Sequence, residues 1–303
     1  MTFEGIGTIL RVMVKRRKNK SLLGDWGELI RWKNTLMALG CVFVGLRLGE
    51  TMVEIPARQI LYLVVGLIFA GGNVVNDFVD IPSDKIAHPR RPLPSGTIKP
   101  KTAFIAGLAI ITAGLLFNLA GMHYYGMIPT IIGVFAAVAI LFYDFLGSRI
   151  PLVGNLVIAL LAGGVFLFVG TAQGLTQAHI YAAGFSALIT LAREIIKDIA
   201  DRPADEKVGI RTIPAVIGDK RAAVLASACM ATIIPLTIVP YFTGVFNEWY
   251  LGPMILFVLL PIVLLALLLP SNISPKKASK YARDLKWVIL GGLFSLLLGG
   301  VAS

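Results

Sequence analysis

Residues 71–84 read GGNVVNDFVDIPSD, and they end a long apolar run with one amide and three carboxylates, at Asn76, Asp77, Asp80 and Asp84. Asn76 and Asp80 are four residues apart, so they share one face of a helix, and Asp77 lies beside them. Carboxylates placed this closely repel one another, and a charged side chain near a bilayer costs about 3 kcal/mol. The pattern therefore predicts a bound hard cation such as Mg²⁺, which commonly accompanies a phosphate-bearing substrate.

The composition around this stretch is that of an integral membrane protein. Of the 303 residues, 56% are hydrophobic and only 15% are charged, and the mean hydropathy is +0.80. Nine apolar runs are long enough, or nearly so, to cross a hydrocarbon layer of about 30 Å. They are approximately 34–48, 57–77, 102–120, 127–143, 153–174, 179–198, 221–242, 251–269 and 285–301. We expect an all-α, multi-pass protein of the cell membrane, with a single domain over residues 1–303.

The positions of the basic residues predict the topology. The net charge is +11, and of the 28 Lys and Arg residues only Arg47 and Arg58 fall outside the N-terminal segment and alternate loops. By the positive-inside rule these basic segments, including the N-terminus, are cytoplasmic. Residues 1–28 are expected to form a basic amphipathic segment at the cytoplasmic membrane surface. The charge therefore indicates topology, and we expect no nucleic-acid partner.

A second acidic stripe ends the sixth apolar run. Residues 192–214 read AREIIKDIADRPADEKVGIRTIP, and the acidic residues Glu194, Asp198, Asp201 and Asp205 are spaced by four, three and four. This spacing places them on one helical face, and Pro203 is expected to end the helix. If the spans alternate, both stripes lie at the cytoplasmic end. Two such stripes facing each other would hold two cations around one diphosphate.

Each acidic stripe is followed by a proline and by basic residues. Pro82 is expected to break the first helix and to leave Asp84 in a loop or a distorted turn. Basic side chains that could cap a metal-bound anion follow, although the positive-inside rule alone would also place them there. They are Lys85, Arg90 and Arg91 after the first stripe and Lys207 after the second.

Several motifs together resemble those of a known family. NDFVDIPSD at residues 76–84 fits the pattern N-D-x-x-D-x-x-x-D, and KDIADRPAD at 197–205 is similar to D-x-x-D-x-x-x-D. RPLPSG at 91–96, GNLVIALLAG at 154–163 and GIRTIPAVIG at 209–218 extend the match. In this order they resemble the motifs of the UbiA superfamily of intramembrane prenyltransferases. The sequence around the second motif is most similar to that of archaeal members. The resemblance covers most of residues 31–218, although RWKN at 31–34 has a Trp where a Pro is common.

The resemblance implies a fold, a reaction and a set of site residues. The fold would be nine helices around a central chamber, and the reaction would ionise a prenyl diphosphate bound through two Mg²⁺ and alkylate an acceptor. The implied metal ligands are Asn76, Asp77, Asp80, Asp84, Asp198, Asp201 and Asp205. Lys85, Arg90, Arg91 and Lys207 would bind the diphosphate. Asn34 and Tyr143 would line the prenyl or acceptor pocket.

The sequence leaves open which acceptor molecule receives the prenyl group. Geranylgeranylglyceryl phosphate and a quinone precursor such as dihydroxynaphthoate are the leading pair, and either is hydrophobic or amphiphilic enough to reach the site from membrane lipid. Two other classes of protein are less consistent with the sequence. A transporter would place its acidic ion sites near the midplane of the membrane. A CDP-alcohol phosphotransferase would carry one compact motif opening with D-G-x-x-A-R, which this sequence lacks.

Overall fold

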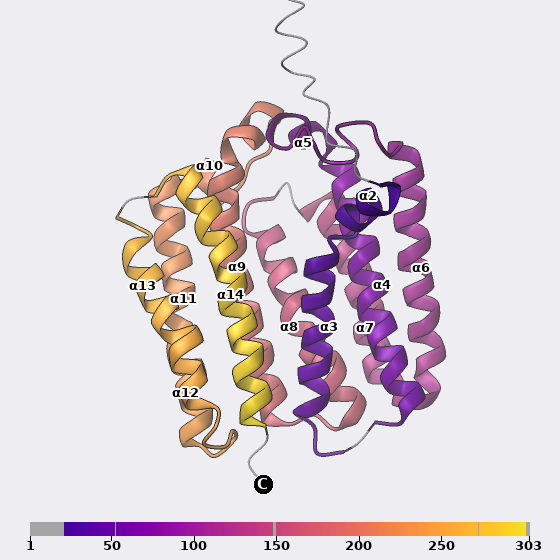
Figure 1. Ribbon diagram of the computed structural model, residues 1–303, viewed down its shortest axis with the longest axis vertical. Coiled ribbons are helices and arrows are strands. Elements are labelled where there is room, and N and C mark those ends of the chain that lie inside the picture. Colours follow the sequence, from indigo (N-terminus) through magenta and orange to yellow (C-terminus); the bar gives the residue numbers. More distant parts are fainter. Residues whose placement is uncertain (1–20, 52, 148–149, 272, 301–303) are drawn as a thin grey trace, which may run out of the picture.

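The computed structural model describes residues 21–51, 53–147, 150–271 and 273–300, and every regular element in these ranges is helical. The predicted all-α class is therefore confirmed for this part of the chain. The long helices run side by side as a bundle, and the short helices α2, α5 and α10 gather at one end of it (Figure 1). Most of the predicted amphipathic segment 1–28, and Arg149, lie outside the described residues.

The apolar runs predicted from the sequence coincide with helices. The first half of the chain forms α2 (Leu22–Leu29), α3 (Trp32–Arg47), α4 (Ile55–Val79), α5 (Ile81–Ala87), α6 (Pro100–Tyr125) and α7 (Met127–Phe145). The second half forms α8 (Val153–Gln173), α9 (Gln177–Asp205), α10 (Ile213–Ile217), α11 (Asp219–Phe242) and α14 (Pro275–Gly299). A short 3₁₀ helix, η2 (Glu206–Val208), follows α9, and α12 (Leu251–Met254), the π-helical η3 (Ile255–Leu259) and α13 (Leu260–Leu268) form one continuous column.

Six of these helices are long and apolar enough to cross a membrane, and the bent pair α2–α3, with an angle of 52°, would be a seventh. Helices α9 and α14 have 29 and 25 residues but contain several charged side chains. Length and apolarity thus support six or seven spans within the described residues, and the count of nine stays a prediction.

The two prolines differ in their effect: α4 ends at Val79, just before Pro82, as expected, whereas α9 continues past Pro203. Pro82 lies in the first turn of α5, where its missing N–H needs no partner. Asp84 therefore lies on a helix, and the expectation of a loop or distorted turn was wrong. Pro203 lies inside α9, which runs on to Asp205, so the expectation that Pro203 ends the helix was also wrong. Pro82 and Pro203 thus cause only local changes in the backbone, and the acidic side chains keep helical spacing.

Glycine sets the distance between α8 and α9. A methyl group added to Gly163 would lie 2.6 Å from the carbonyl oxygen of Ala183 on α9, which is closer than real contacts allow. The neighbouring Gly164 has nothing within 4 Å of the same position. Gly163 therefore lets the two backbones approach closely, as small residues do between membrane helices. This approach brings the start of α8 beside the acidic face of α9.

The first prediction compares these two glycines. We expect Gly163→Ala to lower the free energy of unfolding by about 1–3 kcal/mol, because the helices must separate to admit the methyl group. Gly164→Ala is the matched control and should be neutral or slightly stabilising, since alanine favours helix. Thermal unfolding in detergent would measure both variants. Equal melting temperatures would contradict the close approach of α8 and α9.

Candidate active site

The two acidic motifs meet at one end of the bundle. The first motif spans the end of α4 and the short helix α5, and the second occupies the last turns of α9. Helix α5 packs against both α9 and η2, so it lies across the end of the second motif (Figure 1). The fold thus brings together two segments that are about 120 residues apart in the chain.

Arg31 neutralises the start of the first motif. Its guanidinium donates hydrogen bonds to Asn76 Oδ1 at 2.9 Å and to Asp77 Oδ1 at 2.6 Å. Asn76 and Asp77 are both buried. Arg31 lies between α2 and α3 with a φ of 49°, a left-handed conformation that is unusual for a residue with a side chain. This bend in the chain aims Arg31 at the motif.

In the second half of the first motif, cations balance the negative charges of the carboxylates less evenly. Arg91 forms an ion pair with Asp84, in which Nη1 of the guanidinium donates to both carboxylate oxygens at 2.8 Å. Burial raises the pKa of Asp84, and the positive charge of Arg91 opposes this shift. Burial likewise raises the pKa of Asp80 to about 6, against the opposing charges of Lys197 and Arg31. Asp80 makes no side-chain ion pair with another described residue, so its ionised form would be stabilised by a cation.

The second motif has its own partners on α8 and α9. Asn155 Nδ2 donates to Asp198 Oδ2 at 2.9 Å, across the close contact between the two helices. Glu194 is buried and is paired with Arg193 and, at 3.4 Å, with Lys197. Further along the helix, Asp201 and Asp205 make no ion pair within the described part of the chain.

Carboxylates of the two motifs face each other. Asp205 is repelled by Asp80 and Asp84 of the first motif as well as by Asp201 of its own. Lys197 lies between the motifs, since its charge acts on both Asp80 and Asp205. Negative charge is therefore concentrated on both sides of the space between the two motifs, which we call the gap.

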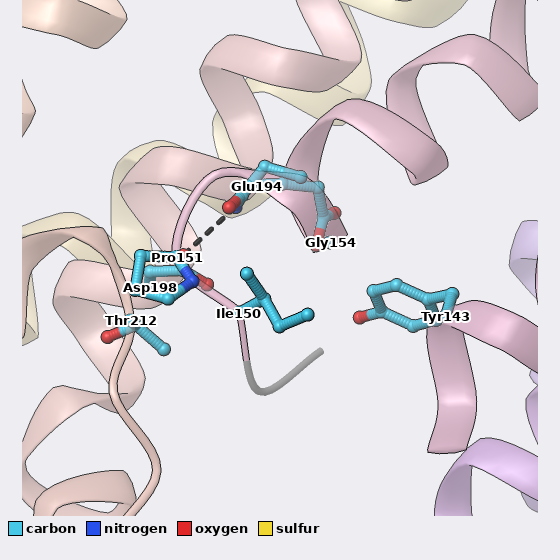
Figure 2. Close-up of a pocket in the computed structure, with 8 residues that line it drawn as sticks. Tyr143, Ile150, Pro151, Gly154, Glu194, Asp198 and Thr212 are labelled. Atoms are coloured by element: carbon cyan, nitrogen blue, oxygen red, sulfur yellow. Dashed lines mark hydrogen bonds between the residues drawn. The ribbon is translucent and has the colours of Figure 1, made fainter. Parts of the chain in front are cut away.

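A pocket lies beside the second motif and reaches toward α7. It is lined by Tyr143, Ile150, Pro151, Gly154, Asn155, Glu194, Asp198 and Thr212. Figure 2 shows Tyr143 and Thr212 on opposite sides of this pocket, with Ile150 between them. The hydroxyl of Tyr143 therefore approaches the acidic face of α9 from across the pocket, where Glu194 and Asp198 lie within electrostatic reach.

The donor set suits Mg²⁺, although no site is fully assembled. In the ranges that the structure describes, no three His, Cys, Asp or Glu side chains are grouped closely enough to hold one ion. Mg²⁺ is usually bound through only one or two carboxylates together with substrate phosphates, so a complete protein cage is not required. The oxygen-only donors fit this ion, and Asp80, Asp201 and Asp205 face the gap without an ion-pair partner among the described residues.

The structure separates the predicted basic residues into two groups. Arg91 contacts the first motif directly. Lys85, Arg90 and Lys207 are exposed, and none of them forms an ion pair with a described acidic residue. Asn34 accepts a hydrogen bond from Lys286 Nζ at 2.8 Å.

Several site residues were missed in the sequence. The sequence motifs gave no role to Arg31, Asn155 or Lys197, and Glu194 was placed in the second acidic stripe without a partner. Asp144 is buried at the end of α7, within electrostatic reach of Asn76 and Asp80 of the first motif. The available signal was the same for each: a polar side chain at the end of an apolar helix that must be paired if it is buried.

Known proteins resemble this chain over most of its length. The model of the UbiA prenyltransferase family matches residues 38–290. A digeranylgeranylglyceryl phosphate synthase of Methanococcoides burtonii is 29% identical over 290 residues, which cover 90% of this chain and 98% of the relative. A solved digeranylgeranylglyceryl phosphate synthase has a TM-score of 0.73 and 30% identity, and the match covers 91% of this chain and 98% of the other. A UbiA homologue from Archaeoglobus fulgidus, solved with GPP and Mg²⁺ bound, shares the fold with a TM-score of 0.67 at 17% identity, over 90% of this chain and 99% of the other.

The second prediction concerns the buried ion pair of Arg31 and Asp77. We expect Arg31→Met to destabilise the protein by about 3 kcal/mol, because it leaves a buried carboxylate without its partner. Adding Asp77→Asn should restore most of that loss, since both charges are then removed. Lys33→Met, at an exposed neighbouring position, is the control. Chemical unfolding of the wild type, Arg31→Met, Asp77→Asn, the double variant and the control would measure the coupling, and additive effects of the two substitutions would contradict it.

Proposed function

This chain belongs to the UbiA prenyltransferase family, and we propose that it transfers a geranylgeranyl group from geranylgeranyl diphosphate to geranylgeranylglyceryl phosphate. The observation that carries this proposal is the pair of acidic motifs facing one gap at the end of an apolar bundle. The relatives named as digeranylgeranylglyceryl phosphate synthases match nearly the whole chain. This likeness favours the glyceryl phosphate acceptor over the quinone precursors that the sequence left open.

The two motifs would bind the diphosphate of the prenyl donor through Mg²⁺. Two ions would be held by Asn76, Asp77, Asp80 and Asp84 on one side and by Asp198, Asp201 and Asp205 on the other. When bound, they would supply positive charge to the diphosphate oxygens as the leaving group departs. Their presence would also relieve the repulsion between Asp80 and Asp205.

Basic side chains of the chain itself would complete the diphosphate site. Arg91 is already held beside the first motif by Asp84. Lys85, Arg90 and Lys207 lie on the exposed segments around it, from which their long side chains reach toward an anion in the gap. Positive charge at this place stabilises the negative charge that develops on the leaving oxygen.

The transfer conserves atoms and charge. The bond between the first prenyl carbon and the diphosphate oxygen breaks, and its electron pair leaves with the diphosphate. The free hydroxyl of the acceptor attacks the allylic cation and forms the ether bond, and its proton passes to the departing diphosphate. Tyr143 presents its ring at the pocket beside Glu194 and Asp198, where an aromatic face would stabilise the cation. The apolar helices exclude water that would otherwise trap this cation.

The proposed topology has nine spans, with the N-terminus and the active site toward the cytoplasm. At 1.5 Å per residue, α9 and α14 extend about 43 Å and about 37 Å, which exceeds the roughly 30 Å of the hydrocarbon layer. Their charged residues lie toward the end of the bundle that carries the acidic motifs. Most of the described Lys and Arg residues also lie at this end of the bundle, which supports a cytoplasmic site by the positive-inside rule.

The third prediction tests the reaction and its acceptor. Purified protein with Mg²⁺ and geranylgeranyl diphosphate should release diphosphate when geranylgeranylglyceryl phosphate is added, but not when 1,4-dihydroxy-2-naphthoate or 4-hydroxybenzoate is added. EDTA should stop the release and added Mg²⁺ should restore it. Release stimulated only by an aromatic acceptor would overturn the acceptor assignment. A transporter would release no diphosphate with any of them.

The fourth prediction tests the two motifs separately. Asp80→Ala and Asp198→Ala should each lower turnover by about a hundredfold or more, because each removes charge that stabilises the transition state. Neither should greatly reduce the amount of folded protein, since neither side chain packs in the apolar core. Glu206→Ala is the control, because Glu206 is adjacent to the second motif but exposed and paired with Arg202. Near-normal turnover in both variants would contradict the two-motif site.

A further inference from the structure

Four cations surround the buried carboxylate of Glu194, and two of them, Arg193 and Lys286, lie outside the two acidic motifs. Lys286 on α14 interacts electrostatically with Arg193, Arg31 and Lys197, which repel it, and with Glu194, which attracts it. Its ammonium group donates a hydrogen bond to Asn34 on α3 at 2.8 Å. The three helices α3, α9 and α14 thus contribute to one basic cluster. We define this cluster as Arg31, Arg193, Lys197 and Lys286.

Arg193 has an unused donor in this cluster. One terminal nitrogen of its guanidinium is paired with Glu194. Its Nε is buried and has no hydrogen-bond partner among the described residues. A buried donor without a partner costs about 1–3 kcal/mol, so such groups are normally satisfied by a ligand or by water. One edge of the guanidinium therefore remains available for an acceptor oxygen.

The charges of the cluster are not balanced by its own residues. Arg31 already forms an ion pair with Asp77. Lys197 and Arg193 are both paired with the single carboxylate of Glu194. Among the described residues, Lys286 has only the neutral amide of Asn34 as its hydrogen-bond acceptor. Unpaired cations are expensive away from water, so the arrangement is stabilised when an anion binds between them.

This anion is distinct from the diphosphate of the donor. Arg193 precedes Asp198 by five residues, so it lies about 7.5 Å further from the end of α9 along the helix axis. The cations assigned to the diphosphate, such as Arg91, lie at the end of the bundle on the other side of the acidic motifs. The basic cluster is therefore deeper, and it lies next to α3 and α14 rather than next to α5.

The acceptor of the proposed reaction has a second anion at a suitable distance. In digeranylgeranylglyceryl phosphate, two glycerol oxygens carry prenyl chains and the third carries the phosphate. The free hydroxyl of the acceptor is therefore at most two carbons from the phosphate-bearing carbon. A phosphate held one to two helical turns from the diphosphate site would leave this hydroxyl near the reacting prenyl carbon.

We propose that Arg193 and Lys286 bind the phosphate of the glyceryl phosphate acceptor, and that Asn34 is a positioning residue that holds Lys286 in place. This inference rests on the proposed function, and it names the side chains that would select the acceptor. A phosphate accepts hydrogen bonds from the free edge of Arg193 and from the ammonium of Lys286 at once. The carboxylate of an aromatic acceptor carries one negative charge where the phosphate carries up to two, so it would balance the two cations less well, which disfavours its binding.

The fifth prediction uses a pair of acceptors that differ only in the phosphate. Arg193→Gln and Lys286→Gln should each raise the KM for geranylgeranylglyceryl phosphate by about tenfold or more, the loss of one charge-assisted hydrogen bond. The KM for geranylgeranyl diphosphate should stay unchanged. With geranylgeranylglycerol, which has no phosphate, wild type and both variants should be equally poor. Lys286→Arg should keep most of the wild-type KM because it keeps the charge.

Arg283→Gln is the matched control, since it removes a positive charge from an exposed position one turn earlier on α14. Unchanged acceptor KM in both test variants would overturn the phosphate site, and so would a raised KM for the diphosphate donor. If the variants do not fold, the wild-type enzyme still decides, because equal use of the two acceptors would also overturn it. Failure of the wild type with both acceptors, in contrast, would refute the proposed function itself.

Discussion

The structure depends on the neutralisation of buried carboxylates at the end of an apolar bundle. Asp77, Asp84 and Glu194 are all buried, and each is paired with at least one cation from a distant or neighbouring part of the chain. A lone charge in this environment would be strongly destabilising, whereas a paired one is tolerated. The need for such a pair explains why Arg31 adopts a left-handed backbone conformation between α2 and α3.

Pairing also determines how precisely the two motifs are placed. Asn155 holds Asp198 from α8, and this bond requires the close approach that Gly163 permits between α8 and α9. Asp80, Asp201 and Asp205 are left facing the gap without an ion-pair partner in the described ranges. The fold thus satisfies the carboxylates that hold the helices together and leaves others available for a cation and its phosphate ligand.

Much of this organisation could be predicted from the sequence, because apolar periodicity and acidic spacing are local. The helices coincide with the apolar runs, and the helical spacing of Asp198, Asp201 and Asp205 is retained to the end of α9. The pairing of side chains from distant segments could not be predicted, since nothing local connects Arg31 to Asp77 or Lys286 to Asn34. Proline effects were misjudged for a related reason. Pro82 lies in the first turn of α5, where its missing N–H needs no partner, whereas Pro203 removes one backbone hydrogen bond only two residues before the end of α9.

Positive charge in the site is divided by depth, and this division bears on how two anionic substrates are kept apart. Arg91 lies with the exposed basic residues at the end of the bundle, while Arg193 and Lys286 lie further inside, on the far side of the acidic stripe. A diphosphate and a phosphate bound in one undivided basic pocket would repel each other and compete for the same cations. Carboxylates between the two groups of cations would separate the anions and would give each its own charge balance. The acidic motifs would then act as a partition between the two substrates as well as a binding site for metal.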